Sequence, residues 1–208
     1  MKHLRPAVML TLFFVVVTGI AFPVVVWAIG NVAFSRQAHG SLIRDSHGAL
    51  IGSELIGQSF SKPEYFHPRP SAAGSGYDGA NSSGTNLGPT SDKLVHGVKD
   101  DPSTKDVDET YLGFEALAKA YRDENGLAPD TTIPADAATR SASGLDPDIS
   151  PANAELQIGR VAKARHLGAD QVRQIVVANT EGRTLLLFGE PRVNVLKVNL
   201  ALDAMTNK

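Results

Sequence analysis

Side chains that recognise other molecules gather in one stretch of small residues, FHPRPSAAGSGYDGANSSGTNLGP at 66–89. Arg69 offers a fork of donors, Tyr77 an aromatic ring with a hydroxyl, and Asp78 and Asn86 short polar groups. A run so rich in Gly, Ser and Pro is typical of a flexible linker. The residues alone leave two readings open, a linker and a loop shaped for a partner.

Motifs for nucleotide, metal or nucleophile chemistry are absent or lack the context that they need. Residues 74–79 match the dinucleotide pattern GxGxxG, but neither a strand before it nor a helix after it is predicted. The chain has no Gly-Lys pair for a Walker A loop, no GxSxG and no HExxH, so its six histidines are expected at the surface or in turns. Asp146 and Asp148 flank Pro147, and this pattern is more typical of residues in a turn than of a catalytic pair of carboxylates. The sequence therefore predicts no catalytic residue, no metal site and no firmly bound cofactor.

Composition excludes several further classes. A net charge of −2 and 6% aromatic residues do not fit a nucleic-acid binder, which needs basic patches and stacking aromatics. The lack of cysteine excludes disulfides, CxxC redox chemistry and thiolate metal sites. The 208 residues leave room for one domain and an appendage.

The appendage is a long apolar segment near the N-terminus. Residues 7–29 carry no charge and would form a helix of about 35 Å, enough to cross a hydrocarbon core of about 30 Å. The run exceeds the apolar core of a cleavable signal peptide, about 7–15 residues. We predict a transmembrane helix over 7–29. Within it, Thr11, Thr18 and Gly19 permit close approach and hydrogen bonding, so we expect them to pack against a helix of a membrane partner.

Basic residues favour one orientation of this helix. Lys2 and Arg5 precede it closely, whereas Arg36 and Arg44 follow at a greater distance. Basic residues flanking a span tend to stay in the cytoplasm, and long domains cross regardless of their own charge. We predict that residues 1–6 are cytoplasmic and that 30–208 form a soluble domain outside the membrane.

The first half of this domain contains short elements and long loops. Apolar pairs at 42–43, 50–51 and 55–56 predict short strands, the first two joined by a turn at 45–48. Residues 61–110 are expected to be largely irregular, with a short helix within 91–98 and a solvated acidic stretch at 100–109. An amphipathic helix is predicted within 109–126, and prolines keep 127–148 extended.

The second half contains two clear helices. Ser150-Pro151 is a strong helix start, a serine N-cap followed by proline at the first helical position. It opens a predicted helix over 151–167, and a second follows over 169–179. The predicted inward residues of the first helix are Ile158, Val161 and Ala162, and its predicted solvated basic face holds Arg160, Lys163 and Arg165.

The C-terminal part is less uniform. Residues 184–188, TLLLF, favour a strand. Residues 192–205 fit both an alternating strand and a helical face, and we favour the helix. The predicted fold class is α+β, one N-terminal transmembrane helix and a small exported domain of short strands and about three to four helices with long Gly/Ser/Pro-rich loops.

The order of these segments resembles the KdpC family, the C subunits of bacterial Kdp potassium-transporting P-type ATPases. The matching stretches are residues 66–89, SASGLDPDISPANAELQIGRVAKAR (141–165) and GEPRVNVLKVNLALD (189–203), behind an N-terminal span. The stretch at 100–109 departs from the family pattern by its length and acidity. The resemblance implies a bacterial plasma-membrane protein that is an accessory, non-catalytic subunit.

The resemblance also implies the partners: a channel-like subunit that selects potassium and a P-type ATPase subunit. It implies a role in assembly, described also as that of a catalytic chaperone that raises the affinity for ATP, with ATP reached through the ATPase subunit. On this basis we predict that Arg69, Tyr77, Asp78 and Asn86 bind a partner subunit, and that their loop orders mainly in the complex. The alternative is an independent, membrane-anchored hydrolase or ligand-binding protein.

Overall fold

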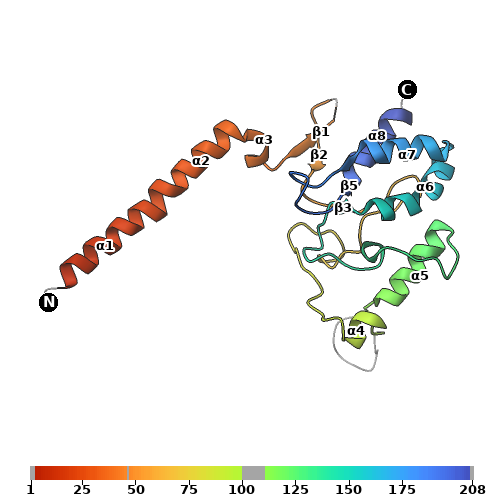
Figure 1. Cartoon of the computed structure of the whole chain (residues 1–208), viewed down its shortest axis with the longest axis horizontal. Coiled ribbons are helices and arrows are strands. Elements are labelled where there is room, and N and C mark those ends of the chain that lie inside the picture. The colour runs from red at the N-terminus through yellow and green to blue at the C-terminus, as the bar shows by residue number, and fades with distance from the viewer. Residues whose placement is uncertain (1–2, 46, 100–110, 207–208) are drawn as a thin grey trace. The chain divides into compact units, whose positions relative to one another are not determined.

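The computed structural model describes residues 3–45, 47–99 and 111–206. The chain forms two compact units, residues 1–53 and 54–208, and each is described by itself. The acidic stretch at 100–109 lies outside the described residues. The described elements confirm the predicted α+β class, with an N-terminal apolar helix followed by short strands and several helices (Figure 1).

The first unit begins with one continuous helix over Leu4–Ala33, which is long and apolar enough to cross a membrane and has no buried residue. It comprises α1 (Leu4–Val16), a π-helical turn (Val17–Ala21) and α2 (Phe22–Ala33). The wide turn ends two residues before Pro23, whose missing N–H prevents the regular i→i−4 bond. The helix over 7–29 is thus confirmed and extends beyond both predicted ends.

A short helix α3 (Ser35–Ala38) leads into an antiparallel hairpin of β1 (Leu42–Arg44) and β2 (Leu50–Ser53). The predicted turn is present: the Asp45 carboxylate accepts bonds from the amides of His47 and Ala49, each 2.8 Å long. The third predicted strand, at 55–56, is not formed, because Leu55 and Ile56 lie in an exposed turn that opens the second unit.

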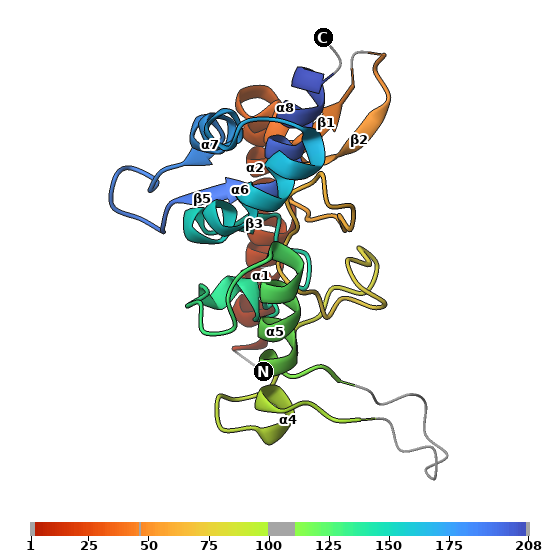
Figure 2. The same cartoon turned by 90° about the vertical axis from the view of Figure 1, so that its right-hand side faces the viewer.

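The second unit is built around three helices and a small sheet. The helices are α6 (Pro151–Arg165), α7 (Ala169–Ala178) and α8 (Val195–Thr206). The strands β3 (Asp148–Ile149), β5 (Arg192–Asn194) and β4 (Thr180–Glu181) pair in that order, all antiparallel. Figure 2 shows these helices beside the strands. The core shared by these elements is aliphatic apart from one aromatic residue, and that residue is Phe66, from the Gly/Ser/Pro-rich stretch.

The helix start predicted at Ser150-Pro151 is confirmed. The Ser150 hydroxyl oxygen accepts a 3.1 Å bond from the Asn153 amide, and its hydroxyl donates to Asp136 over 2.9 Å. Ile158, Val161 and Ala162 are buried, as their spacing predicts.

Two further helices, α4 (Asp92–Val95) and α5 (Phe114–Asn125), contribute no residue to this core. α4 falls within the predicted 91–98, and α5 ends at Gly126, which is left-handed with φ 65°. A single 3₁₀ turn (Ala135–Ala137) interrupts the extended 127–148 region.

The two remaining C-terminal predictions have different outcomes. Residues 192–205 form a strand and then a helix, the two structures that the sequence left open. Val193 of β5 pairs with both neighbouring strands. Asn194 then caps α8, because its side-chain oxygen accepts a 3.1 Å bond from the Lys197 amide. The favoured helix is confirmed from Val195 onward. The strand predicted at 184–188 is wrong: only an isolated Thr184–Phe188 bridge forms, around an exposed turn.

Candidate partner-binding surface

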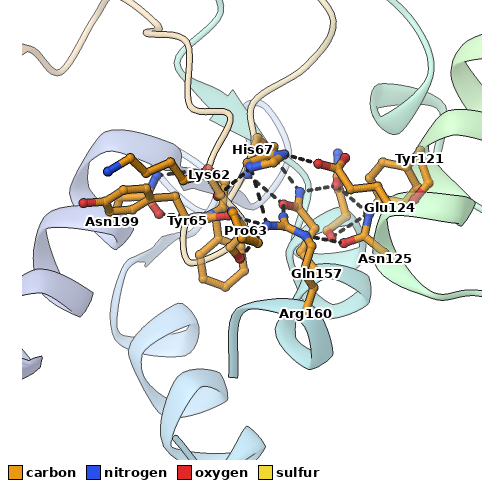
Figure 3. A network of polar contacts seen from close by, with 12 residues as sticks. Lys62, Pro63, Tyr65, His67, Tyr121, Glu124, Asn125, Gln157, Arg160 and Asn199 are labelled. Atoms are coloured by element: carbon orange, nitrogen blue, oxygen red, sulfur yellow. Dashed lines mark hydrogen bonds and ion pairs between the residues drawn. The ribbon is translucent and has the colours of Figure 1, made fainter. Parts of the chain in front are cut away.

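The Gly/Ser/Pro-rich stretch begins at a clasp formed by two helices (Figure 3). Asn199 of α8 accepts from the Phe66 amide (2.8 Å) and donates to the Phe66 carbonyl (3.0 Å). Gln157 of α6 repeats the arrangement at His67, accepting over 2.7 Å and donating over 3.1 Å. Both amide side chains are 1% exposed. The two side-chain amides thus bond the backbone N–H and C=O groups of Phe66 and His67, as a neighbouring strand would do. The extended chain can therefore enter the core without unpaired backbone groups.

Arg160 reinforces the clasp. Its guanidinium donates to the carbonyls of Pro63 and Tyr65 and to the side chains of Gln157 and Asn125, over distances of 2.7–3.0 Å. Burial lowers the pKa of Arg160. The prediction that Arg160 faces solvent is therefore wrong, because the carbonyls of the 63–65 segment need donors and Arg160 supplies them.

Arg165 also departs from the predicted basic face. Its side chain is 5% exposed, pairs with Asp203 over 2.7 Å and donates to the Glu64 carbonyl over 2.6 Å. Of the three predicted basic residues, Lys163 alone is exposed. The sequence pattern could not show this, because the segment that binds these arginines lies about 100 residues earlier in the chain.

His67 extends the clasp to α5. Its Nδ1 lies 2.7 Å from the Glu124 carboxylate, and its Nε2 lies 2.9 Å from the Lys62 carbonyl. Its side chain is 15% exposed, so the expectation of a surface histidine is wrong here. The hydrogen bond from His67, with the nearby charges of His67 and Arg160, lowers the pKa of Glu124 against the opposing effect of burial.

Tyr121 ties the same helix to α6. Its hydroxyl lies 2.8 Å from the side-chain oxygen of Asn153, which also accepts from Gln157 over 2.8 Å. Burial, and next the charge of Asp136, raise the pKa of Tyr121. These bonds join α5, α6 and the start of the loop into one polar cluster, defined as His67, Tyr121, Glu124, Gln157 and Arg160.

Two of the four predicted partner-binding residues are used inside the domain. Arg69 pairs with Asp146 over 2.8 Å. Tyr77 donates its hydroxyl to the Arg69 carbonyl over 2.6 Å, and burial raises the pKa of Tyr77 strongly, with a further rise from Asp146. Asp146 also accepts from the Asp148 amide over 3.1 Å, a local bond of the kind that turns use. The turn prediction is wrong for Asp148, which lies in β3 and pairs with Arg192 over 3.1 Å.

The loop is fixed further along by close backbone contact with residues 139–146. A Cβ on Gly84 would lie 2.6 Å from the Ala142 carbonyl oxygen, and one on Gly144 would lie 2.6 Å from that of Ser83. Gly144 is also left-handed, with φ 68°. The expectation that the loop orders mainly in a complex therefore needs revision, because its glycines serve intramolecular packing.

Of the other two predicted residues, Asp78 is half-buried and bonded only within its own loop, and Asn86 is exposed. Asp78 accepts from the Asn81 side chain over 2.6 Å and from the Ala80 amide over 2.9 Å, and these bonds lower the pKa of Asp78. Asn86 is exposed and left-handed, with φ 53°. Partner binding by Arg69, Tyr77, Asp78 and Asn86 stays a prediction, and Asn86 is the exposed residue among the four.

The predicted helix-packing residues lie on the exposed apolar helix. The hydroxyls of Thr11 and Thr18 donate to the carbonyls of Ala7 and Phe14, over 2.9 and 2.7 Å. Gly19 lies in the π-helical turn, with open space at its Cβ position. Both hydroxyls are therefore satisfied within the helix, and contact with a partner helix stays a prediction for all three residues.

Two open hollows flank the polar cluster. One, of about 490 Å³, lies between α5 and α6 and includes Asp123, Lys163 and His166 in its lining. The other, of about 350 Å³, lies beside Arg69 and Tyr77. In the part of the chain that the structure describes, no three His, Cys, Asp or Glu side chains are grouped to share a metal ion.

The residues that hold the loop, and whose role the sequence did not predict, are Gln157, Asn199, Arg160, His67 and Glu124. One signal was available. Gln157 and Asn199 occupy inward positions of mostly apolar helix faces, and a polar residue there needs a buried partner. Nothing in the sequence indicated that the partner is the backbone at 66–67.

Comparison with known proteins gives a consistent result over nearly the whole chain. A family model described as "KdpC: K+-transporting ATPase, c chain" matches residues 4–204. A protein of Caulobacter sp. (strain K31), named potassium-transporting ATPase KdpC subunit, is 48% identical over 204 residues, covering 98% of this chain and 94% of its own. A protein of the same name from Mycobacterium tuberculosis (strain ATCC 25618 / H37Rv) is 46% identical over 204 residues, covering 98% and 99%.

Proposed function

Because the chain belongs to the KdpC family, the c chains of K+-transporting ATPases, we propose that it is the non-catalytic assembly subunit of such a pump. Potassium transport by an ATPase complex follows from the family itself. The finer role is that this subunit assists the assembly and function of a channel-like subunit and a P-type ATPase subunit. The relatives give no support to an independent hydrolase or ligand-binding protein.

One observation carries the non-catalytic role. Four polar side chains whose types could take part in catalysis are each engaged in holding the 62–84 segment on the domain: Arg69, His67, Glu124 and Asp146. Such a network makes a stiff body with a fixed surface, which suits a subunit that binds neighbours by shape. The apolar helix Leu4–Ala33 supports a place in the membrane beside them.

We place residues 30–208 on the outer face of the membrane, on the basic bias ahead of the helix. Any effect on ATP affinity then passes through the membrane subunits as a coupling free energy, since ATP is cytoplasmic. The chain has no cysteine, so single cysteines report the side directly. Ser75→Cys should react with a membrane-impermeant maleimide in spheroplasts, and His3→Cys should react only after lysis. The reverse pattern would place the domain in the cytoplasm.

The assembly role is tested by deleting the gene and restoring it in variant forms. Deletion should abolish growth at limiting potassium, and the purified chain alone should not hydrolyse ATP. The double variant Asp78→Ala/Asn86→Ala should weaken co-purification of the channel-like and ATPase subunits, because Asn86 is exposed and Asp78 is only half-buried and bonded within its own loop. A matched control is Asp170→Ala/Gln174→Ala on exposed positions of α7, which should change nothing. Equal recovery with both double variants would refute binding through the loop.

A further inference from the structure

Four consecutive apolar side chains project from the second unit between β4 and β5. Leu185, Leu186, Leu187 and Phe188 are 78%, 88%, 74% and 64% exposed. In Figure 2 the blue loop that leads into β5 extends away from the helices. Scattered exposed apolar residues are ordinary, but a contiguous run at a loop tip marks a surface that is covered in use. Leu185–Phe188 are called the apolar tip below.

The backbone of the apolar tip is closed on itself. The Leu187 and Phe188 amides donate to the Thr184 carbonyl over 3.2 and 2.9 Å, and the Thr184 amide donates to the Phe188 carbonyl over 2.8 Å. Leu185 and Leu186 are both left-handed, with φ 53° and 63°. A two-residue turn of this kind strongly prefers Asn-Gly. Leucine is unfavourable at both positions of this turn, and neither leucine is buried in the described chain. The stability of the fold therefore does not explain why leucine occurs at 185 and 186.

Matched charges surround the base of the apolar tip. Arg183 pairs with Glu190 over 2.7 Å, and Glu181 pairs with Arg192 over 2.8 Å and with Lys197 over 3.0 Å. An apolar centre inside a polar rim is the usual anatomy of a protein–protein contact. Loops that insert into lipid instead combine apolar residues with basic residues that attract anionic headgroups. Here each arginine of the rim already has a carboxylate partner, which favours a protein over a lipid surface.

We propose that the apolar tip inserts into an apolar pocket on another subunit of the potassium-transporting ATPase, with the paired rim residues around the pocket mouth. This inference rests on the proposed function, since it needs the chain to assemble with those subunits. The closed turn holds the four side chains outward before binding, which reduces the ordering cost of association. The contact is separate from the loop at 66–89.

The test replaces the apolar tip with the residues that its turn prefers. Leu185→Asn/Leu186→Gly removes the two most exposed side chains of the tip and suits the left-handed turn, so the full-length variant should unfold at the same temperature as wild type or higher. Its affinity for the purified channel-like and ATPase subunits in detergent should fall by about tenfold or more, as expected for central apolar contacts. Val177→Ser is the control, since Val177 is an exposed apolar residue on α7 at 67% exposure.

The outcomes separate the two proposals. If wild type does not associate with those subunits, the proposed function fails and this inference with it. If wild type associates and Leu185→Asn/Leu186→Gly associates equally well, the apolar tip is not a contact and the proposed function stands. A lipid occupant is tested with a fluorophore on Leu187→Cys in vesicles that contain this chain alone. Quenching of the fluorophore by brominated lipid in these vesicles would show insertion into lipid and would overturn the proposal. No quenching there, together with a blue shift of the fluorophore's emission when the other subunits are added, would support a protein pocket.

Discussion

Replacement of Gln157 by leucine tests whether the clasp holds the 66–89 loop on the domain. Leucine has a similar size but no polar atoms, so it should fit the core while losing each bond that the amide makes. Those bonds reach both backbone groups of His67, over 2.7 and 3.1 Å, as well as Asn153 and Arg160. Arg160 retains the carbonyls of Pro63 and Tyr65, and Asn153 retains Tyr121. The groups left without a partner are therefore the amide and carbonyl of His67.

The expected magnitude follows from these two backbone groups. A polar group left buried and unpaired costs about 1–3 kcal/mol, so the two groups together should lower the free energy of unfolding of Gln157→Leu by about 2–6 kcal/mol. That is a large share of a typical stability of about 5–15 kcal/mol. Gln174→Leu makes the same chemical change at an exposed position of α7 and should alter stability by less than about 0.5 kcal/mol.

The assay is chemical denaturation of the full-length chain in detergent, followed by near-ultraviolet circular dichroism of the tyrosines. All four tyrosines lie beyond residue 53, so their signal reports the second unit and not the apolar helix. Hydrogen exchange at the amides of Phe66 and His67 should accelerate in Gln157→Leu. A loss of less than about 0.5 kcal/mol, with unchanged exchange, would refute the clasp.

Three further predictions concern stability. The hydrogen bond from His67 holds the pKa of Glu124 below its usual 4.5, so this pair should stabilise the fold above pH 4.5 and lose its effect as pH falls through the lowered value. Glu124→Gln should then differ from wild type by less than about 1 kcal/mol at pH 7, because the carboxylate is 41% exposed, and the difference should vanish in acid denaturation curves. Ser150→Ala should cost about 1 kcal/mol by removing the cap of α6, whereas Ser75→Ala in the exposed loop should be neutral in the same unfolding experiment. Gly144→Ala should lower the free energy of unfolding by more than about 2 kcal/mol, because φ is 68° and the new Cβ would lie 2.6 Å from the Ser83 carbonyl oxygen. The melting temperature measures this loss, and Gly182→Ala is the control, since a Cβ there would have no atom within 4 Å.

The 66–89 loop shows how one composition fits two structures. Gly, Ser and Pro lower the chance of a regular element, and this is all that composition reports. In this protein the same residues bring two backbones into contact at Gly84 and Gly144. Ser71 adds a bond of 2.6 Å to the Gly144 carbonyl. The loop is thus part of the packed domain, and partner binding by Asp78 and Asn86 remains a prediction.

The sequence alone was sufficient for several features that depend on neighbours within a few positions. The charge-free run at 7–29, the cap at Ser150 and the end of α5 at Gly126 act through local length, hydrogen bonding and φ, so their positions were predictable. The family resemblance rested likewise on contiguous motifs, and it is confirmed over residues 4–204.

Tertiary structure alone decided which polar side chains form bonds inside the domain and which remain exposed. Arg160 has the spacing of a solvated residue, yet it binds carbonyls of residues 63 and 65. The 184–188 run has the composition of a strand, yet it finds no partner strand among the described residues and turns outward instead. Both outcomes depend on segments far apart in the chain: Arg160 bonds such a segment, and within the described residues the 184–188 run lacks one to pair with. Local propensity carries no information about such contacts, because their free energy arises only when the whole fold brings the segments together.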